Sequence, residues 1–251
     1  MTKKEVGHNF LARLGKKRLR PGGVTATNWL MEQGQFNKNS QVLEVACNMC
    51  TTSIELAQTF GCSIIGVDMD PKALDKARTN IQRAGLTDLI QVQQGNAMKL
   101  PFPDNSFDIV INEAMLTMLR GDAKEKAIRE YLRVLKPGGR LLTHDVAYES
   151  DHMENLLQQL SQTIHVNVQP LKIDQWQNLF HELGFSNVTS KHGAMTLMSP
   201  AGMVKDEGLP GAMTILRNGL KKENREQFLN MFRFFNKTGK DLRYIAVCSV
   251  K

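Results

Sequence analysis

Five short apolar runs, separated by stretches with helical spacing, organise the middle of the chain. Strands that alternate with helices in this way predict an α/β fold in which helices cover both faces of a doubly wound parallel sheet. The expected strands are Gln41–Ala46, Ser63–Asp68, Ile90–Gln94, Phe107–Asn112 and Arg140–Asp145, and the expected helices are Thr51–Phe60, Lys72–Ala84 and Ala123–Leu135.

The last third of the chain is less regular. It predicts helices at His152–Leu160 and Ile173–Leu183, a sixth strand at Asn187–Met198, a loop at Pro200–Pro210, two more helices, and a seventh strand at Asp241–Val250. The short loop before the last strand favours an antiparallel partner at the sheet edge. We therefore predict seven strands, mostly parallel, with an antiparallel last strand.

The first forty residues form a different pattern. Phe10, Leu11 and Leu14 share one helical face, and a second helix is expected near Val24–Glu32. We expect residues 1–40 to form a helical cap, with Arg18 or Arg20 able to meet an anionic substrate. Residues 41–251 then form one domain, with a helical insertion at about 200–236.

Composition excludes several classes of protein. No apolar run reaches the roughly 18–20 residues of a membrane span, and the N-terminus lacks the apolar core of a signal peptide. The net charge of +7 is scattered except at Lys16–Arg20, so nucleic acid is not the expected partner. One C-x-x-C among four cysteines does not complete a zinc site. We expect a cytoplasmic monomer or homodimer without a metal.

The stretch Gln41–Leu56 predicts a ligand site. Its apolar run ends in small residues, and hydroxyl residues then begin a helix, so backbone N–H groups and a positive dipole end face one point. Glu44 lies within the apolar run, where a carboxylate is costly unless it binds something. In parallel sheets ligands lie beyond the carboxyl ends of the strands, beside the first one. A cofactor is therefore expected over this turn.

Four segments, in this order, resemble the class I S-adenosylmethionine-dependent methyltransferases, especially the small-molecule type related to the ubiquinone and menaquinone C-methyltransferases. They are VLEVACNMC, IIGVDMDPKALDKAR, QGNAMKLPFPDNSFDIV and RVLKPGGRLL, which together span Gln41–Asp145. The later KIDQWQNLFHELGF resembles the helix before strand six of that family. The resemblance implies a Rossmann-like fold, S-adenosyl-L-methionine as cofactor, and methyl transfer to a small-molecule acceptor.

The resemblance also implies residue roles. Glu44 would help to hold the methionine end of the cofactor, above a turn formed by Ala46, Cys47, Asn48 and Cys50. Asp68 would take both ribose hydroxyls and Met69 would lie against the adenine. Asn96 and Ala97 would meet the adenine edge, and Asn112 would line the sulfonium side.

Two departures from the family's pattern matter. None of the three motif glycines is present, and Ala46, Asn48 and Cys50 stand in their places. Glycine serves there because the backbone must bend tightly, and Asn is the residue that best tolerates positive φ among the others. Asn96 replaces the usual Asp, so its amide oxygen accepts a hydrogen bond without a charge, at a loss of about 1 kcal/mol.

Methyl transfer requires an aligned acceptor and, for poor nucleophiles, a base. Candidate catalytic residues near the crevice are Glu113, His144 and Asp145, with Tyr148 and His8 also within reach of it. Neighbouring backbone groups could instead satisfy His144, and helix N-termini could bind the two carboxylates.

Other functions stay open at this point. Asp68 also suits a dinucleotide-binding dehydrogenase, although G-x-G-x-x-G is absent. The Cys47–Cys50 pair suits redox chemistry. A nucleic-acid methyltransferase would carry a different sequence after strand four than Asn112-Glu113-Ala114-Met115. The missing glycines, finally, motivate a non-catalytic module that has lost the cofactor.

Overall fold

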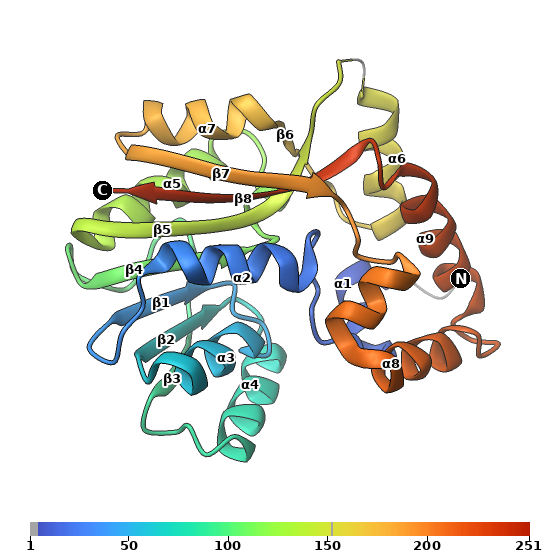
Figure 1. Ribbon diagram of the computed structural model, residues 1–251, viewed down its shortest axis with the longest axis horizontal. Helices are drawn as coiled ribbons and strands as arrows, with labels where there is room; N and C mark the ends of the chain where they lie inside the picture. The colour runs from blue at the N-terminus through green and yellow to red at the C-terminus, as the bar shows by residue number, and fades with distance from the viewer. Residues whose placement is uncertain (1–4, 152) are drawn as a thin grey trace.

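The structure, a computed structural model that describes residues 5–151 and 153–251, is built on one sheet (Figure 1). The strands follow the order β3-β2-β1-β4-β5-β8-β7, and β8 runs antiparallel to both β5 and β7. Their bounds are β1 (Gln41–Val45), β2 (Ser63–Asp68), β3 (Ile90–Gln94), β4 (Phe107–Glu113), β5 (Leu135–Tyr148), β7 (Ser186–Ala194) and β8 (Leu242–Val250). A two-residue β6 (Leu171–Lys172) pairs with the end of β5. This arrangement confirms the predicted α/β fold.

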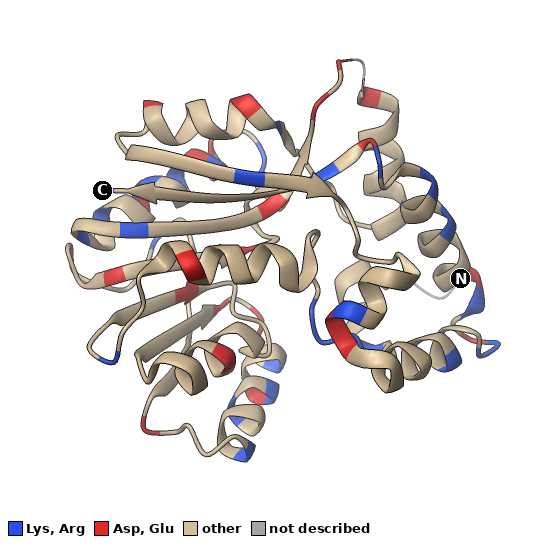
Figure 2. Cartoon of the chain, in the orientation of Figure 1, with Lys and Arg blue, Asp and Glu red and all other residues tan. Residues whose placement is uncertain are grey.

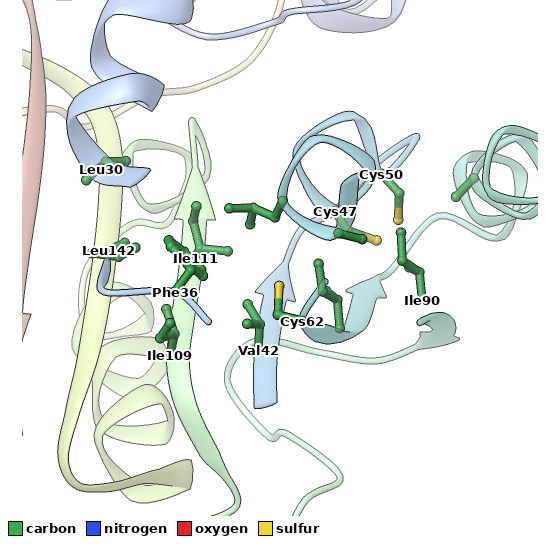
Figure 3. Close-up of a cluster of buried hydrophobic side chains, with 14 of the residues drawn as sticks. Leu30, Phe36, Val42, Cys47, Cys50, Cys62, Ile90, Ile109, Ile111 and Leu142 are labelled. Atoms are coloured by element: carbon green, nitrogen blue, oxygen red, sulfur yellow. The ribbon is translucent and has the colours of Figure 1, made fainter. Parts of the chain in front are cut away.

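Helices cover both faces of the sheet, because the strands bury apolar side chains on each side. On one face lie α2 (Gly23–Gly34), α3 (Thr51–Phe60) and α4 (Pro71–Arg83), which contribute Leu30, Leu56 and Leu74 to one core. Figure 3 shows Leu30 in this core with Val42, Ile109 and Ile111 of the sheet. On the other face, α5 (Ala123–Val134) and α7 (Ile173–Glu182) bring Ile128, Tyr131, Trp176 and Phe180 against the sheet.

Four helices form a separate lobe with its own core. They are α1 (Gly7–Leu14), α6 (Glu154–Ile164), α8 (Pro200–Gly219) and α9 (Arg225–Thr238). Phe10, Leu11 and Leu14 of α1 meet Ile215 of α8 and Phe228 of α9 in this core. Figure 1 shows the lobe beyond the carboxyl ends of β1 and β2. The two N-terminal helices therefore separate, since α2 packs on β5 and β8 while α1 joins the lobe.

The predicted loop at Pro200–Pro210 is wrong, because these residues form the first half of α8. The helix begins where the Ser199 hydroxyl accepts a hydrogen bond from the Gly202 N–H at 3.0 Å, with Pro200 in the first turn. Gly208, with φ 71° and ψ 167°, kinks the helix without ending it. The residues that favoured a loop therefore have other roles: Pro200 lies at the start of α8, and Gly208 and Pro210 lie at its kink.

Other boundaries shift slightly. β5 begins at Leu135 and includes the Lys136-Pro137-Gly138-Gly139 segment that was expected to precede it, and β7 ends at Ala194, before Met198. In the predicted helix His152–Leu160, residue 152 lies outside the described residues, and α6 begins at Glu154. Within the described part of the chain, no helix is long and apolar enough to cross a membrane.

Candidate functional site

A cleft of about 320 Å³ opens where the carboxyl ends of β1, β2 and β4 meet. The parallel strands place polar residues from distant parts of the chain along one edge, as expected. The N-terminal segment adds to its wall through His8, Leu19 and Arg20. Of the residues predicted to hold a cofactor, the cleft is lined by Glu44, Ala46, Cys47, Asn48, Asp68, Met69, Asn96 and Ala97.

The turn between β1 and α3 takes a glycine-like backbone without glycine. Ala46, Asn48 and Cys50 have φ of 59°, 47° and 57°, all in the left-handed region. This conformation costs an L-residue about 1–2 kcal/mol. Hydrogen bonds hold the turn: the Cys47 N–H donates to the Val67 carbonyl at 3.1 Å, and the Cys50 N–H to the Cys47 carbonyl at 2.8 Å. The motif turn therefore forms despite the three replacements.

The two cysteines of the turn are core residues. Cys47 and Cys50 are both buried (Figure 3). A Cβ on Gly66 of β2 would lie 2.9 Å and 3.1 Å from their sulfurs. A hydrogen bond to Cys50 and burial both raise the pKa of the Cys47 thiol. Because the thiolate is the reactive form, this thiol is a poor nucleophile. The sulfurs fill space beside β2, which only a glycine at position 66 leaves open.

Glu44 supports the turn from below. Its Oε2 accepts hydrogen bonds from the Ser53 N–H, at 3.1 Å, and from the Ser53 hydroxyl, so the carboxyl group binds the first turn of α3. Burial raises the pKa of Glu44 to about 7, and the nearby Glu113 carboxylate adds to this effect. The carboxyl group also lines the cleft, where a cationic ligand would stabilise its ionised form.

Asp68 closes the other side of the turn. Its Oδ2 accepts from the Asn48 N–H and its Oδ1 from the Asp70 N–H, both at 2.9 Å. A carboxylate offers about four lone-pair sites, so each oxygen keeps capacity for one hydroxyl donor. Beside it, the Met69 side chain is 65% exposed, which is unusual for a large apolar group. The pair presents two acceptors next to an apolar surface in the cleft.

Asn96 and Asn112 are placed differently. Asn96 lines the cleft, but its Oδ1 already accepts from the Met98 N–H at 2.9 Å. Asn112 is fully buried, donates to the Thr143 hydroxyl at 3.0 Å, and is not among the residues that line the cleft. Side chains alternate along a strand, so Glu113, the next residue of β4, faces the cleft instead.

Glu113 is the centre of a buried network between the N-terminal segment and the sheet. Its Oε2 lies 3.0 Å from Arg20 Nε and accepts from the Thr52 hydroxyl at 2.6 Å, while its Oε1 accepts from the Thr27 hydroxyl at 3.0 Å. Burial alone would raise the pKa of Glu113, but Arg20 and then His144 outweigh it and hold the pKa at about 2. A carboxyl group with this pKa is a weak base.

His144 completes the network and is fully buried. Its Nε2 accepts from the Gly22 N–H at 3.0 Å, so its Nδ1 carries the proton and donates to Glu113 Oε1 at 3.2 Å. Both nitrogens are therefore engaged, and the residue does not line the cleft. Backbone and carboxylate partners satisfy the imidazole, which is the alternative that the sequence left open.

A second, smaller cavity of about 80 Å³ adjoins the cleft. The two share the residues His8, Leu19, Ala114 and Met118, so they are neighbouring compartments. The lining of the cavity is almost entirely apolar and comes mainly from the lobe, including Leu160, Val166 and Met231. The sequence alone did not identify most of its lining residues, because they are far apart in the chain and meet only through the packing of α1, α6 and α9.

The polar residues of this cavity are few. Asp145 is fully buried, and its oxygens accept from the Thr117 N–H at 3.0 Å and from the Val146 N–H at 2.8 Å. Burial raises its pKa, opposed by the hydrogen bonds from Thr117. His8 lies on the side shared with the cleft, and burial lowers its pKa. A neutral imidazole, a carboxyl group and the Thr117 side chain are thus the polar groups at the border of a mainly apolar space.

The arginines expected to meet an anionic substrate already have partners. Arg18 is 2.7 Å from Glu55 Oε2, and Arg20 is bound within the Glu113 network. The Arg18 guanidinium thus holds the N-terminal segment on α3, and the Arg20 guanidinium holds it on β4. Their charge is compensated within the chain.

Comparisons with known proteins agree with this geometry. A family model described as a methyltransferase domain matches residues 43–143. An uncharacterized protein of Haemophilus influenzae is 58% identical over 251 residues, which is the whole of both chains. A demethylmenaquinone methyltransferase of Lactiplantibacillus plantarum is 30% identical over 166 residues, which is 65% of this chain and 68% of the relative.

Some matches are partial. Demethylmenaquinone methyltransferases of two other bacteria, Desulfitobacterium hafniense and Symbiobacterium thermophilum, are matched over 42% and 44% of their own length. Among solved structures, a phosphoethanolamine N-methyltransferase of Haemonchus contortus in complex with S-adenosyl-L-methionine superposes with a TM-score of 0.78. The identity is 14%, over 98% of this chain and 56% of that one, so this likeness concerns the fold.

Proposed function

This chain belongs to the class I S-adenosylmethionine-dependent methyltransferases, and from that premise we propose that it methylates a small molecule whose apolar part enters the cavity beside the cleft. S-adenosyl-L-methionine is the cofactor of the family and supplies an activated methyl group on a sulfonium. The single observation that carries the proposal is the shared wall of the two compartments, formed by His8, Leu19, Ala114 and Met118.

The residues of the cleft fit this cofactor. Each Asp68 oxygen has capacity for one ribose hydroxyl, and the exposed Met69 side chain offers an apolar surface for adenine. Glu44 provides a carboxyl group that ionises most readily beside a cation, and the cofactor carries positive charge at its amino and sulfonium groups. Asn96 retains one lone pair on its amide oxygen for the adenine amino group.

The candidate catalytic residues divide into two groups. Of Glu113, His144 and Asp145, only Asp145 lines the apolar cavity, so we assign to it the contact with the acceptor. Glu113 and His144 are assigned to positioning, since they bind Arg20 and the Gly22 backbone and so hold the start of α2 on the sheet. Asn112 supports β4 through Thr143 rather than touching the cofactor.

A labelling experiment tests the proposed acceptor class. The protein is incubated with S-adenosyl-L-methionine that carries a labelled methyl group and with three separate fractions of cells that produce it: small molecules extracted into organic solvent, RNA, and protein. We expect label in the small-molecule fraction. Label confined to RNA or protein would contradict the proposal.

A cavity-filling variant tests the location of the acceptor. Val166→Trp places a large side chain in the cavity of about 80 Å³ and is expected to abolish labelling while S-adenosyl-L-methionine binding, measured by calorimetry, is retained. Val204→Trp, at an exposed position on α8, is the matched control and keeps both properties. Full labelling by Val166→Trp would place the acceptor elsewhere.

A further inference from the structure

The outer face of α8 carries an exposed apolar stripe that the methyltransferase site does not use. Leu209, Met213, Leu216 and Leu220 are 62%, 63%, 45% and 46% exposed. Their spacing of four, three and four residues places them within about 60° of one another around the helix, along about 16 Å of its length. Large apolar side chains scattered singly are ordinary, but a continuous stripe marks an interaction surface.

Two structural features keep this stripe at the surface. The neighbouring face of the same helix is buried in the lobe, where Ala212 and Ile215 pack with Phe10 and Leu11 of α1. The kink at Gly208 separates the stripe from the first half of α8, where Asp206 and Glu207 bind Lys16 at 3.3 Å and 3.6 Å. The second half of the helix therefore presents apolar and basic groups outward, together with Thr214, and no acidic group.

The charged residues along the stripe itself are basic. From residue 208 to residue 222 the sequence contains the basic residues Arg217, Lys221 and Lys222 and no acidic residue, and the exposed Glu223 follows. All three basic residues are exposed, and Arg217 lies next to the stripe, about 80° around the helix from Leu209. Figure 2 shows blue segments at the end of α8 and in the loop that follows it, at the lower right. An apolar face bordered by cations is the pattern of helices that lie in a bilayer interface.

We propose that the second half of α8 docks on an anionic lipid surface, with the four apolar side chains inserted at the headgroup boundary and Arg217, Lys221 and Lys222 against lipid phosphates. A second copy of the chain fits less well, because the acidic residues toward the other end of this helix, Asp206 and Glu207, are buried and already paired with Lys16, so they do not face these cations. The inner face of the docked lobe contains the apolar cavity, so docking would bring that cavity near the phase in which an apolar acceptor dissolves. That consequence rests on the proposed function, whereas the docking itself does not.

Vesicle flotation tests the docking with the full chain. Vesicles of equal parts phosphatidylcholine and phosphatidylglycerol are expected to carry the protein at low salt, and vesicles of phosphatidylcholine alone to bind it about tenfold more weakly. Raising the salt concentration is expected to weaken binding to the anionic vesicles. Absence of binding to the anionic vesicles would overturn the proposal, whatever the methyltransferase assay shows.

Paired variants assign the effect to the stripe. Met213→Ser with Leu216→Ser, and separately Lys221→Glu with Lys222→Glu, are each expected to lower the partition to anionic vesicles about tenfold or more. Met213→Leu with Leu216→Met keeps the apolar face, and Lys76→Glu with Arg83→Glu makes the same charge change at exposed positions of α4, so both retain binding. Circular dichroism checks that each variant is folded.

The alternative occupants give distinct results. If both stripe variants bind vesicles as the wild type does, the stripe is not the docking surface and the proposal is wrong. If the serine variant instead changes a dimer to a monomer in sedimentation while vesicle binding is unchanged, a second copy covers the stripe. Neither result alters methyl transfer, which is assayed separately.

Discussion

Glu44 shows how one residue couples the core to the cleft. It is a carboxyl group inside an apolar strand, held by Ser53 and close to the ionised Glu113. Burial raises the pKa of Glu44 to about 7, whereas Arg20 and His144 hold that of Glu113 at about 2. The two neighbouring carboxyl groups therefore have different roles. Glu113 is a permanent negative charge that binds the N-terminal segment, and Glu44 ionises readily only when a cation is near.

The pH dependence of stability follows from these values. The folded state binds a proton on Glu44 more tightly than the unfolded chain, in which the pKa is near 4.5. The free energy of unfolding therefore falls as pH rises from about 4.5 to about 7, by about 3 kcal/mol from this group. Glu113 acts in the opposite direction and in a different window, since its contribution is lost as pH falls from about 4.5 to about 2.

Urea unfolding over a range of pH measures this effect. Glu44→Gln is expected to remove the decline between pH 4.5 and 7 and to leave the acid limb, due to Glu113, in place. Glu125→Gln, which changes an exposed carboxyl group on α5, is the control and should follow the wild-type curve. A Glu44→Gln curve parallel to that of the wild type would show that Glu44 ionises normally in the folded protein.

At the scale of the element, the strand–turn–helix unit at β1 and α3 tolerates three left-handed residues because its surroundings fix them. The Asn48 N–H binds Asp68 of β2, Glu44 binds the start of α3, and the cysteine sulfurs fill the space above Gly66. The strain of the turn is therefore offset by contacts to two strands and one helix. Cys50 also contributes a buried side chain, which glycine would remove. Ala46 is therefore the position at which a glycine would relieve the backbone strain with the smallest loss of other contacts.

Ala46→Gly is expected to stabilise the protein by up to about 1 kcal/mol, because release of the left-handed strain exceeds the entropy that glycine loses on folding. Ala12→Gly, in the regular helix α1, is the matched control and is expected to destabilise by about 0.5–1 kcal/mol. Urea denaturation compares the two. Equal destabilisation by both substitutions would mean that Ala46 is unstrained.

The sequence predicted the elements whose signals are local and failed where packing decides. The strands from Gln41 to Asn112 and the cleft residues follow from periodicity and from the rule that ligands lie at the carboxyl edge of a parallel sheet. Successive side chains of a strand point to opposite faces, so a shift of one residue at the end of β4 exchanges the side chains that face the cleft. The sequence did not show that Glu113 rather than Asn112 faces it. The kinked α8 was missed because Gly208 and Pro210 are strong loop signals.

The residues of the apolar cavity were harder to predict still. This cavity is formed mainly by side chains of α1, α6 and α9, and no local pattern brings residues so far apart in the chain together. His144 and Glu113 were named as catalytic candidates because they are polar residues at strand ends, but their hydrogen bonds bind Gly22 and Arg20. A polar residue at a strand end can thus serve a ligand or hold a neighbouring element, and only its partners distinguish the two.

At the scale of the whole molecule, the protein is a sheet with a cleft at the carboxyl ends of its strands and a helical lobe beside that cleft. The lobe contributes His8 and Leu19 to the cleft and most of the wall of the apolar cavity. In the proposed function, the cofactor and the acceptor meet at the wall shared by both compartments. We propose that S-adenosyl-L-methionine occupies the cleft with its ribose on Asp68.

Isothermal titration calorimetry of the protein with S-adenosyl-L-methionine tests this claim most directly. We predict saturable binding by the wild type, a loss of affinity of about a hundredfold or more in Asp68→Ala, since two hydrogen bonds to a charged group are lost, and unchanged affinity in Asp75→Ala, an exposed carboxylate on α4. The absence of binding by the wild type, or wild-type affinity in Asp68→Ala, would contradict the account.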